Sequence, residues 1–216
     1  MKYQLTEPER GNTILQYAIQ LSEDHPWISQ FAPIGADIFL IIYPIFLIIF
    51  YLKGIIKKQT EKKEWALFIF LSCAITLIIN IIIQSFFFKN RPNIEIRDAS
   101  TEETLLHQRL PQSSFPSDHA VVSMSIAIAS LVWGYKTKNK LLIWFSYVLI
   151  LIAIIMSACR VITVVHRPSD ILGGFILAII IPILLGYTPL LTYLKKWIIT
   201  PIIKCEERII KKCFNY

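Results

Sequence analysis

Two arginines and one serine in this chain have the chemistry to hold a phosphate group. Arg91 precedes Pro92, Ser117 stands in the string Pro-Ser-Asp-His at 116–119, and Arg160 follows a long apolar stretch. An arginine side chain presents a planar fork of donors that matches phosphate oxygens, and a serine at a helix start adds a hydroxyl and backbone N–H groups. We therefore expect Arg91, Ser117 and Arg160 to form an anion pocket.

Two histidines and an aspartate supply matching catalytic groups. His166 and Asp170 are four residues apart, and if Pro168 starts a helix, Asp170 lies in its first turn and accepts the ring proton of His166. A carboxylate in that place fixes the imidazole tautomer and leaves the other ring nitrogen free to attack phosphorus. His119 suits the general acid that protonates the leaving oxygen, because the unperturbed pKa of a histidine is about 6.5.

Long apolar runs must position these residues. The chain has 216 residues, 55% of them hydrophobic, and this composition excludes an ordinary soluble domain. A hydrocarbon core about 30 Å thick requires roughly 20 apolar helical residues, and five runs approach or reach that length with at most one charge. These runs cover residues 33–52, 65–88, 120–135, 141–159 and 171–187. We predict an all-α fold, a polytopic membrane bundle of five transmembrane helices with amphipathic helices at both termini.

Lysines between the runs predict how the bundle sits in the membrane. Five lysines lie within residues 53–64 and three within 136–140, and the positive-inside rule places such segments in the cytoplasm. Five spans then place the N-terminus outside and the C-terminus inside. We expect an extracytoplasmic segment over residues 1–32, a membrane domain over 33–187 and a basic amphipathic cytoplasmic tail over 188–216.

The two terminal segments leave alternatives. Residues 190–198 favour a basic amphipathic helix on the inner surface, although 190–203 is apolar enough for a sixth transmembrane helix. Residues 13–21 favour a similar surface helix outside. We expect Pro26 and Pro33 to interrupt the continuation of that helix into the first span.

The predicted topology brings the polar motifs to the outer ends of neighbouring helices, and their spacing resembles that of a known family. The family signature is K-x6-R-P, P-S-G-H and S-R-x5-H-x3-D, and this chain has Q-x6-R-P, P-S-D-H and C-R-x5-H-x3-D in the same order. Over roughly residues 33–187 the chain therefore resembles the type 2 phosphatidic acid phosphatase superfamily. The resemblance implies a phosphohistidine intermediate on His166, oriented by Asp170, with His119 as the acid and no metal or other cofactor. It also assigns the phosphate to three ligands: Arg91, Ser117 and Arg160.

Three departures from the signature narrow the resemblance. Gln84 replaces a phosphate-binding lysine, Cys159 replaces a serine and Asp118 replaces a glycine. The string Ser-Phe-Pro-Ser-Asp-His at 114–119 is similar to the undecaprenyl-diphosphatases of the bacitracin-resistance type, which share this variant. That similarity implies hydrolysis of a polyprenyl diphosphate, undecaprenyl diphosphate, to undecaprenyl phosphate and inorganic phosphate. Gln84 and Asp118 are then additional candidates for phosphate binding.

The same similarity implies a biological setting. The site would face the periplasmic or extracellular side of a bacterial cytoplasmic membrane, recycle the lipid carrier of cell-wall synthesis and confer bacitracin resistance. The net charge of +7 comes mainly from basic residues beside the apolar spans. The expected partners therefore include anionic lipids and exclude nucleic acid.

Two other functions stay open on the sequence. Another lipid phosphatase would act on phosphatidylglycerol phosphate, phosphatidic acid or the phosphates of lipid A with the same residues. A non-catalytic binding or transport protein would use the arginines to hold phosphate headgroups. Such a protein needs neither an acid nor an oriented nucleophile, so the presence of His119 and His166 argues against it.

Overall fold

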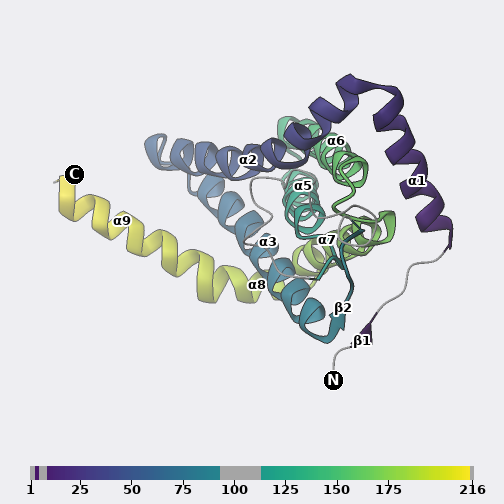
Figure 1. Ribbon diagram of the computed structural model, residues 1–216. Helices are drawn as coiled ribbons and strands as arrows, with labels where there is room; N and C mark the ends of the chain where they lie inside the picture. The colour runs from purple at the N-terminus through teal and green to yellow at the C-terminus, as the bar shows by residue number, and fades with distance from the viewer. Residues whose placement is uncertain (1–2, 5–8, 93–112, 215–216) are drawn as a thin grey trace.

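Five long helices, packed side by side and alternating in direction, form the body of the part of the chain that the structure describes (Figure 1). The computed structural model describes residues 3–4, 9–92 and 113–214. The five helices are α2 (Pro26–Ile56), α3 (Thr60–Phe86), α5 (Asp118–Lys136), α6 (Lys140–Ile162) and α7 (Pro168–Tyr187). Each predicted apolar run lies largely within one of them, and the predicted all-α membrane bundle is confirmed.

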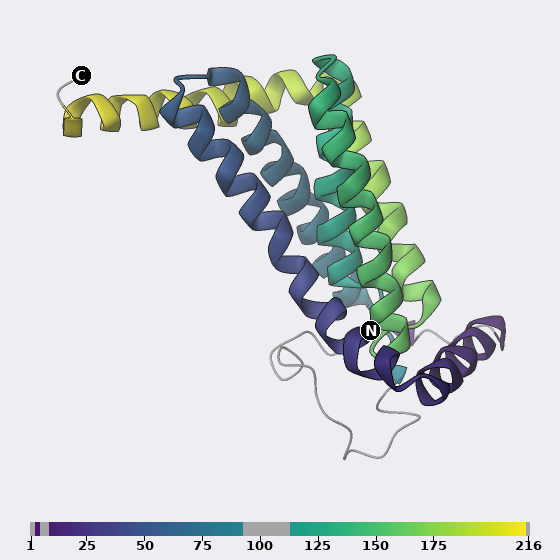
Figure 2. The ribbon, with the colours of Figure 1, turned by 90° about the horizontal axis from the view of Figure 1, so that it is seen from above.

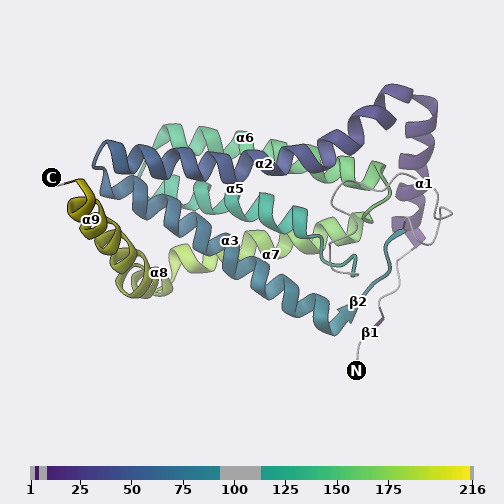
Figure 3. The ribbon, with the colours of Figure 1, turned by 60° about the vertical axis from the view of Figure 1, so that its left-hand side comes forward.

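The outer helices of the bundle have the apolar surface that lipid requires. In the described residues, α2, α3, α6 and α7 are long and apolar enough to cross a membrane, whereas the 19-residue α5 lies among them (Figure 3). The serines of α5 are consistent with this central place. Ser123 and Ser130 are fully buried, and each donates a hydrogen bond to the carbonyl oxygen one turn earlier, at His119 and Ile126.

Two glycines allow α7 to approach α5 closely. A Cβ atom at Gly174 would lie 3.0 Å from both the carbonyl oxygen of Ser117 and the Cβ of Ala120. A Cβ atom at Gly186 would lie 2.3 Å from Cγ1 of Val132. The two helices therefore pack backbone against backbone, and this contact sets the distance between the polar groups at their ends.

The N-terminal helix and the start of the first span differ in part from expectation. α1 (Glu9–Asp24) covers the predicted surface helix and lies across one end of the bundle (Figure 2). Pro26 opens α2 and separates it from α1, as predicted. Pro33, however, lies inside α2 and does not interrupt it, so the prediction for this residue was wrong. An apolar helix continues past a proline because it loses few hydrogen bonds there and neighbouring helices support it.

The C-terminal tail is helical and lies across the opposite end of the bundle (Figure 2). Lys63 of α3 forms ion pairs with Glu206 and Glu207, at 3.4 and 2.9 Å, and thereby holds the tail against the bundle. This arrangement favours a surface helix over a sixth span. The tail consists of α8 (Leu190–Leu194), a π-helical segment η2 (Lys195–Ile199) and α9 (Thr200–Phe214).

Two very short strands complete the described structure. β1 (Tyr3–Gln4) pairs in parallel with β2 (Phe87–Phe88), which directly follows α3. The pairing ties the N-terminus to the end of α3, beside the segment that carries the first polar motif.

The close contact between α5 and α7 can be tested by adding one methyl group. Gly186→Ala should lower the free energy of unfolding by about 1–3 kcal/mol, because the new Cβ overlaps the stiff side chain of Val132. Thermal unfolding of the purified protein in detergent measures the loss. The double variant with Val132→Ala should recover much of it; losses that simply add would contradict this packing.

Candidate active site

The six residues predicted to do chemistry meet at the end of the bundle where α3 ends and α5 begins. All six are buried, with exposed fractions of 4% or less. They are Arg91 after α3, Ser117 and His119 at the start of α5, Arg160 in the last turn of α6, His166 in the connection to α7, and Asp170 in the first turn of α7. Burying so many polar groups is unfavourable unless they are paired, so the partners of each group indicate its role.

Backbone hydrogen bonds hold the connection between α6 and α7 in place. The N–H groups of Val165 and His166 both donate to the carbonyl oxygen of Arg160, at 3.1 and 3.2 Å. Val164 is fully buried and has φ of 59°, a left-handed conformation that β-branched residues rarely adopt. Strained backbone conformations of this kind are most frequent at functional sites. Here it turns the chain back so that Arg160 and His166 serve the same site.

His166 uses its two ring nitrogens differently. Nδ1 lies 3.0 Å from the carbonyl oxygen of Ser114 and 3.7 Å from Oδ2 of Asp170. Only the first distance is that of a hydrogen bond, so Nδ1–H donates to Ser114 and Asp170 acts on the ring by its charge. The hydroxyl of Ser114 donates to Oδ2 of Asp170 and links the two groups. The direct ring-to-carboxylate bond expected from the sequence is therefore replaced by a connection through Ser114.

Burial keeps His166, the expected nucleophile, neutral. It lowers the pKa of His166 to about 3, and the nearby carboxylate of Asp170 opposes this shift only in part. Nε2 of His166 lies 3.4 Å from Nη1 of Arg91. With the proton on Nδ1, the lone pair of Nε2 faces the arginine that is expected to hold the phosphate.

Several buried donors near this nitrogen lack a hydrogen-bond partner within the described part of the chain. Arg160 donates from Nη1 to Oδ1 of Asp37 at 2.9 Å, but its Nε and Nη2 atoms have no partner. The hydroxyl of Ser117 and Nε2 of His119 have none either. A buried donor without a partner costs about 1–3 kcal/mol, so a group of them indicates a place for an anionic ligand.

Asp37 links the two groups that flank this place. Its Oδ1 accepts from Arg160 and lies 3.6 Å from Nε2 of His119. A carboxylate near the end of a membrane helix can be exposed at the interface or pair with a buried cation, and the structure shows the pair with Arg160. Since Asp37 belongs to α2, the first long helix also contributes to the site.

Gln84 and Asp118 bind each other instead of facing an open space. Nε2 of Gln84 donates to Oδ1 of Asp118 and to the carbonyl oxygen of Pro116, both at 2.9 Å. Asn80 donates to the same carboxylate oxygen at 2.6 Å. The amide hydrogens of Gln84 are thus used, and its remaining oxygen is an acceptor that does not suit a phosphate. The geometry favours a positioning role for Gln84 and Asp118: together they hold the start of α5 in place.

Lys89 is a residue of the site that the sequence analysis did not single out. Its Nζ donates to Oδ1 of Asp170 at 2.8 Å and to the hydroxyl of Ser169 at 2.7 Å, and its exposed fraction is 3%. The only sequence signal is a lysine two positions before Arg91 in a chain that lacks the usual lysine at position 84. Lys89 therefore supplies the positive charge that a lysine at position 84 would carry, but it places this charge beside Asp170.

A family model for the PAP2 superfamily matches residues 65–191, which include all three polar motifs. The chain belongs to the PAP2 superfamily. It is 26% identical over 155 residues to a protein of Escherichia coli (strain K12) named putative undecaprenyl-diphosphatase YbjG, covering 72% of this chain and 70% of that protein. It is 28% identical over 142 residues to undecaprenyl-diphosphatase BcrC of Bacillus subtilis (strain 168), covering 66% of this chain and 65% of that protein. No solved structure matches the chain.

As a member of the PAP2 superfamily, this chain is a membrane phosphatase, and the cluster of polar motifs is its candidate active site. The matched region begins within α3 and ends in α8, so α2 and its Asp37 lie outside it.

Lys89 can be tested as a positioning residue. Lys89→Met leaves the buried carboxylate of Asp170 without its ion pair, so kcat should fall about tenfold or more, with less change in KM. Lys89→Arg should retain part of the activity because it keeps the charge. Lys57→Met, an exposed lysine at the other end of the bundle, is the matched control. Wild-type kcat in Lys89→Met would contradict the role.

The neutrality of His166 can be observed by NMR of the protein labelled with ¹⁵N-histidine. Because burial lowers its pKa to about 3, the ring should keep one protonated nitrogen, Nδ1, from pH 8 down to about pH 5. The signal is assigned by its loss in His166→Gln. A ring that becomes doubly protonated near pH 6.5 would show that water reaches His166 and that burial does not lower its pKa.

Proposed function

We propose that the protein hydrolyses undecaprenyl diphosphate to undecaprenyl phosphate and inorganic phosphate through a phosphohistidine intermediate. The observation that carries the proposal is the set of unpartnered buried donors on Arg160 and Ser117, in the same cluster as the lone pair of His166. This set suits a terminal phosphate held for in-line attack. The names of the two bacterial relatives support the choice of a polyprenyl diphosphate.

In the first step, Nε2 of His166 attacks the terminal phosphorus and the bond from phosphorus to the bridging oxygen breaks. The imidazole becomes positively charged as the new bond forms, and Asp170, 3.7 Å from Nδ1, stabilises that charge. The carbonyl of Ser114 keeps the ring in place. Arg91, Arg160 and Ser117 hold the phosphoryl oxygens as negative charge moves from the phosphorus to the leaving group.

His119 completes the reaction as acid and then as base. It gives a proton to the bridging oxygen, so undecaprenyl phosphate leaves. It then takes a proton from the water that attacks the phosphohistidine, and inorganic phosphate is released while His166 regains its lone pair. Oδ1 of Asp37 lies 3.6 Å from Nε2 of His119 and orients the imidazole ring.

The proposed setting is a bacterial cytoplasmic membrane with the site at the outer face. Two lysine-bearing turns, between α2 and α3 and between α5 and α6, lie at the end of the bundle opposite the site, which supports this orientation. A polyprenyl chain can stay in the bilayer against the exposed apolar side chains of the outer helices while its diphosphate reaches the site. Recycling of the cell-wall lipid carrier and bacitracin resistance would follow.

A substrate panel with purified protein tests the reaction. Undecaprenyl diphosphate should be turned over with a kcat/KM about tenfold or more above phosphatidylglycerol phosphate, phosphatidic acid and lipid A phosphate. His166→Ala should lower the rate by about 10³-fold or more, whereas the exposed His25→Ala should not change it. A preference for another lipid would overturn the substrate. No phosphate release from any lipid would favour a binding or transport protein.

The orientation is tested with an impermeant thiol reagent on intact cells, in a background without native cysteines. A cysteine at the exposed Ser29, at the site end of α2, should be labelled, and one at the exposed Thr60, at the other end of the bundle, should not. The reverse pattern would place the site in the cytoplasm.

A further inference from the structure

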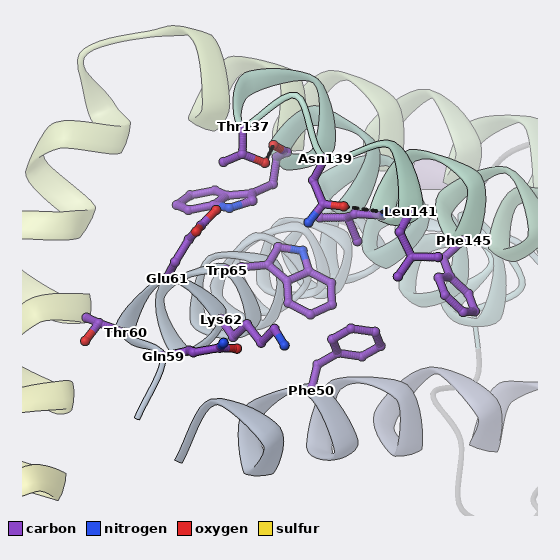
Figure 4. Close-up of a pocket in the computed structure, with 12 residues that line it drawn as sticks. Phe50, Gln59, Thr60, Glu61, Lys62, Trp65, Thr137, Asn139, Leu141 and Phe145 are labelled. Atoms are coloured by element: carbon purple, nitrogen blue, oxygen red, sulfur yellow. Dashed lines mark hydrogen bonds between the residues drawn. The ribbon is translucent and has the colours of Figure 1, made fainter. Parts of the chain in front are cut away.

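A cavity of ≈ 460 Å³ lies at the end of the bundle opposite the active site. It opens between the turn that joins α2 to α3 and the turn that joins α5 to α6, and Figure 4 shows its lining. Aromatic rings make up much of the wall, with contributions from Phe50, Trp65, Trp133 and Phe145. The volume falls within the range of small-molecule sites, roughly 300–1,000 Å³.

Two hydrogen-bond donors in this wall have no partner within the described residues. The indole nitrogens of Trp65 and Trp133 are buried and unpartnered, and the two side chains are only 3% and 4% exposed. In Figure 4 the ring of Trp65 lies between Phe50 and Asn139. A buried indole usually finds an acceptor, so two such donors on one cavity indicate a ligand with acceptor oxygens.

The charge around the cavity indicates the sign of that ligand. The lining itself holds a cation and a carboxylate, Lys62 and Glu61. Nζ of Lys195 lies 4.7 Å from the centre of the Trp133 ring and pairs with Glu64 at 2.8 Å. Residues 53–64 and 136–140, which form the two turns, hold eight lysines and two glutamates. Lys63 pairs with Glu206 and Glu207 of the tail, but the other seven lysines still outnumber the two glutamates of the turns, so this end of the bundle attracts an anion.

The surface beside the opening is apolar. Leu141 and Phe145 line the cavity and are 64% and 41% exposed, on a helix that is long and apolar enough to span a membrane. A ligand at this place therefore meets donors and lysines at one end and a lipid-facing helix surface at the other. A glycerophospholipid has this distribution of groups.

We propose that this cavity binds the headgroup of an anionic glycerophospholipid of the leaflet farther from the active site. The indole N–H groups of Trp65 and Trp133 donate to phosphate or ester oxygens, and Lys62 lies near the phosphate. The acyl chains lie along α6 beside Leu141 and Phe145. The site is independent of the catalytic residues, so the proposal does not rest on the substrate of the active site.

Native mass spectrometry of delipidated protein in detergent, titrated with phosphatidylglycerol or phosphatidylcholine, tests this site. Phosphatidylglycerol should bind at least about tenfold more tightly than phosphatidylcholine. Trp65→Phe/Trp133→Phe keeps the rings but removes both donors, and it should weaken phosphatidylglycerol binding about tenfold or more. Lys62→Gln, at a partly exposed position, should weaken it about threefold or more and provides a variant with little risk to folding.

Matched controls separate this site from other places on the protein. Trp27→Phe/Trp144→Phe changes two exposed indoles outside the cavity and should leave the Kd within about twofold of wild type. Arg91→Ala/His166→Ala disables the catalytic end and should retain the tightly bound lipid. Four results would overturn the proposal. The first two are unchanged affinity in Trp65→Phe/Trp133→Phe and equal binding of phosphatidylcholine. The other two are loss of the lipid in Arg91→Ala/His166→Ala and displacement of the lipid by glycerol phosphate.

Discussion

Arg160 places a positive charge at the end of an apolar helix bundle, where its exposed fraction is only 1%. The site depends on how this charge is held. Asp37 pairs with one nitrogen of the guanidinium and leaves the other two without a partner among the described residues. Breaking such a buried pair typically costs about 3–5 kcal/mol. The pair therefore fixes α2 against α6 and at the same time presents unused donors, which a phosphate can complete.

The buried charges around the site leave an excess of positive charge, which attracts an anion. Among the described residues, four cations lie at or beside the site, and three carboxylates hold them or the start of α5. The cations are Lys89, Arg91, Arg160 and Arg167, and the carboxylates are Asp37, Asp118 and Asp170. Each carboxylate is engaged by donors of the protein, so none turns a free negative charge toward the phosphate. An entering phosphate therefore gains hydrogen bonds without displacing an internal ion pair.

The replacement of lysine by Gln84 has a structural consequence at this position. A lysine there would bring a charge next to Asp118, whereas the neutral amide satisfies both Asp118 and the carbonyl of Pro116. The start of α5, with Ser117 and His119, is thereby fixed by neutral hydrogen bonds. Lys89 places the lysine charge of the site beside Asp170, where it supports the carboxylate that acts on His166.

Sequence reasoning predicted the helices and the meeting of the six site residues, because apolar length determines the spans and alternating spans bring motif ends together. It did not predict which atoms would touch. The contact of His166 with Ser114 depends on the left-handed turn at Val164, and nothing in a β-branched residue type signals such a turn. The prediction that Pro33 interrupts the helix was wrong, because a packed apolar helix tolerates a proline. Lys89 was missed because its partner, Asp170, is distant in the sequence.

In the proposed mechanism, the unpartnered donors and the free nitrogen of His166 bind the same phosphate. An experimental structure of the protein with orthovanadate, which adopts the five-coordinate geometry of a phosphorus under attack, tests it most directly. We predict vanadium bonded to Nε2 of His166, with oxygens accepting from Arg160 and the hydroxyl of Ser117. Vanadate bound elsewhere, or bound at this end without a bond to His166, would show that these groups do not form one phosphate site.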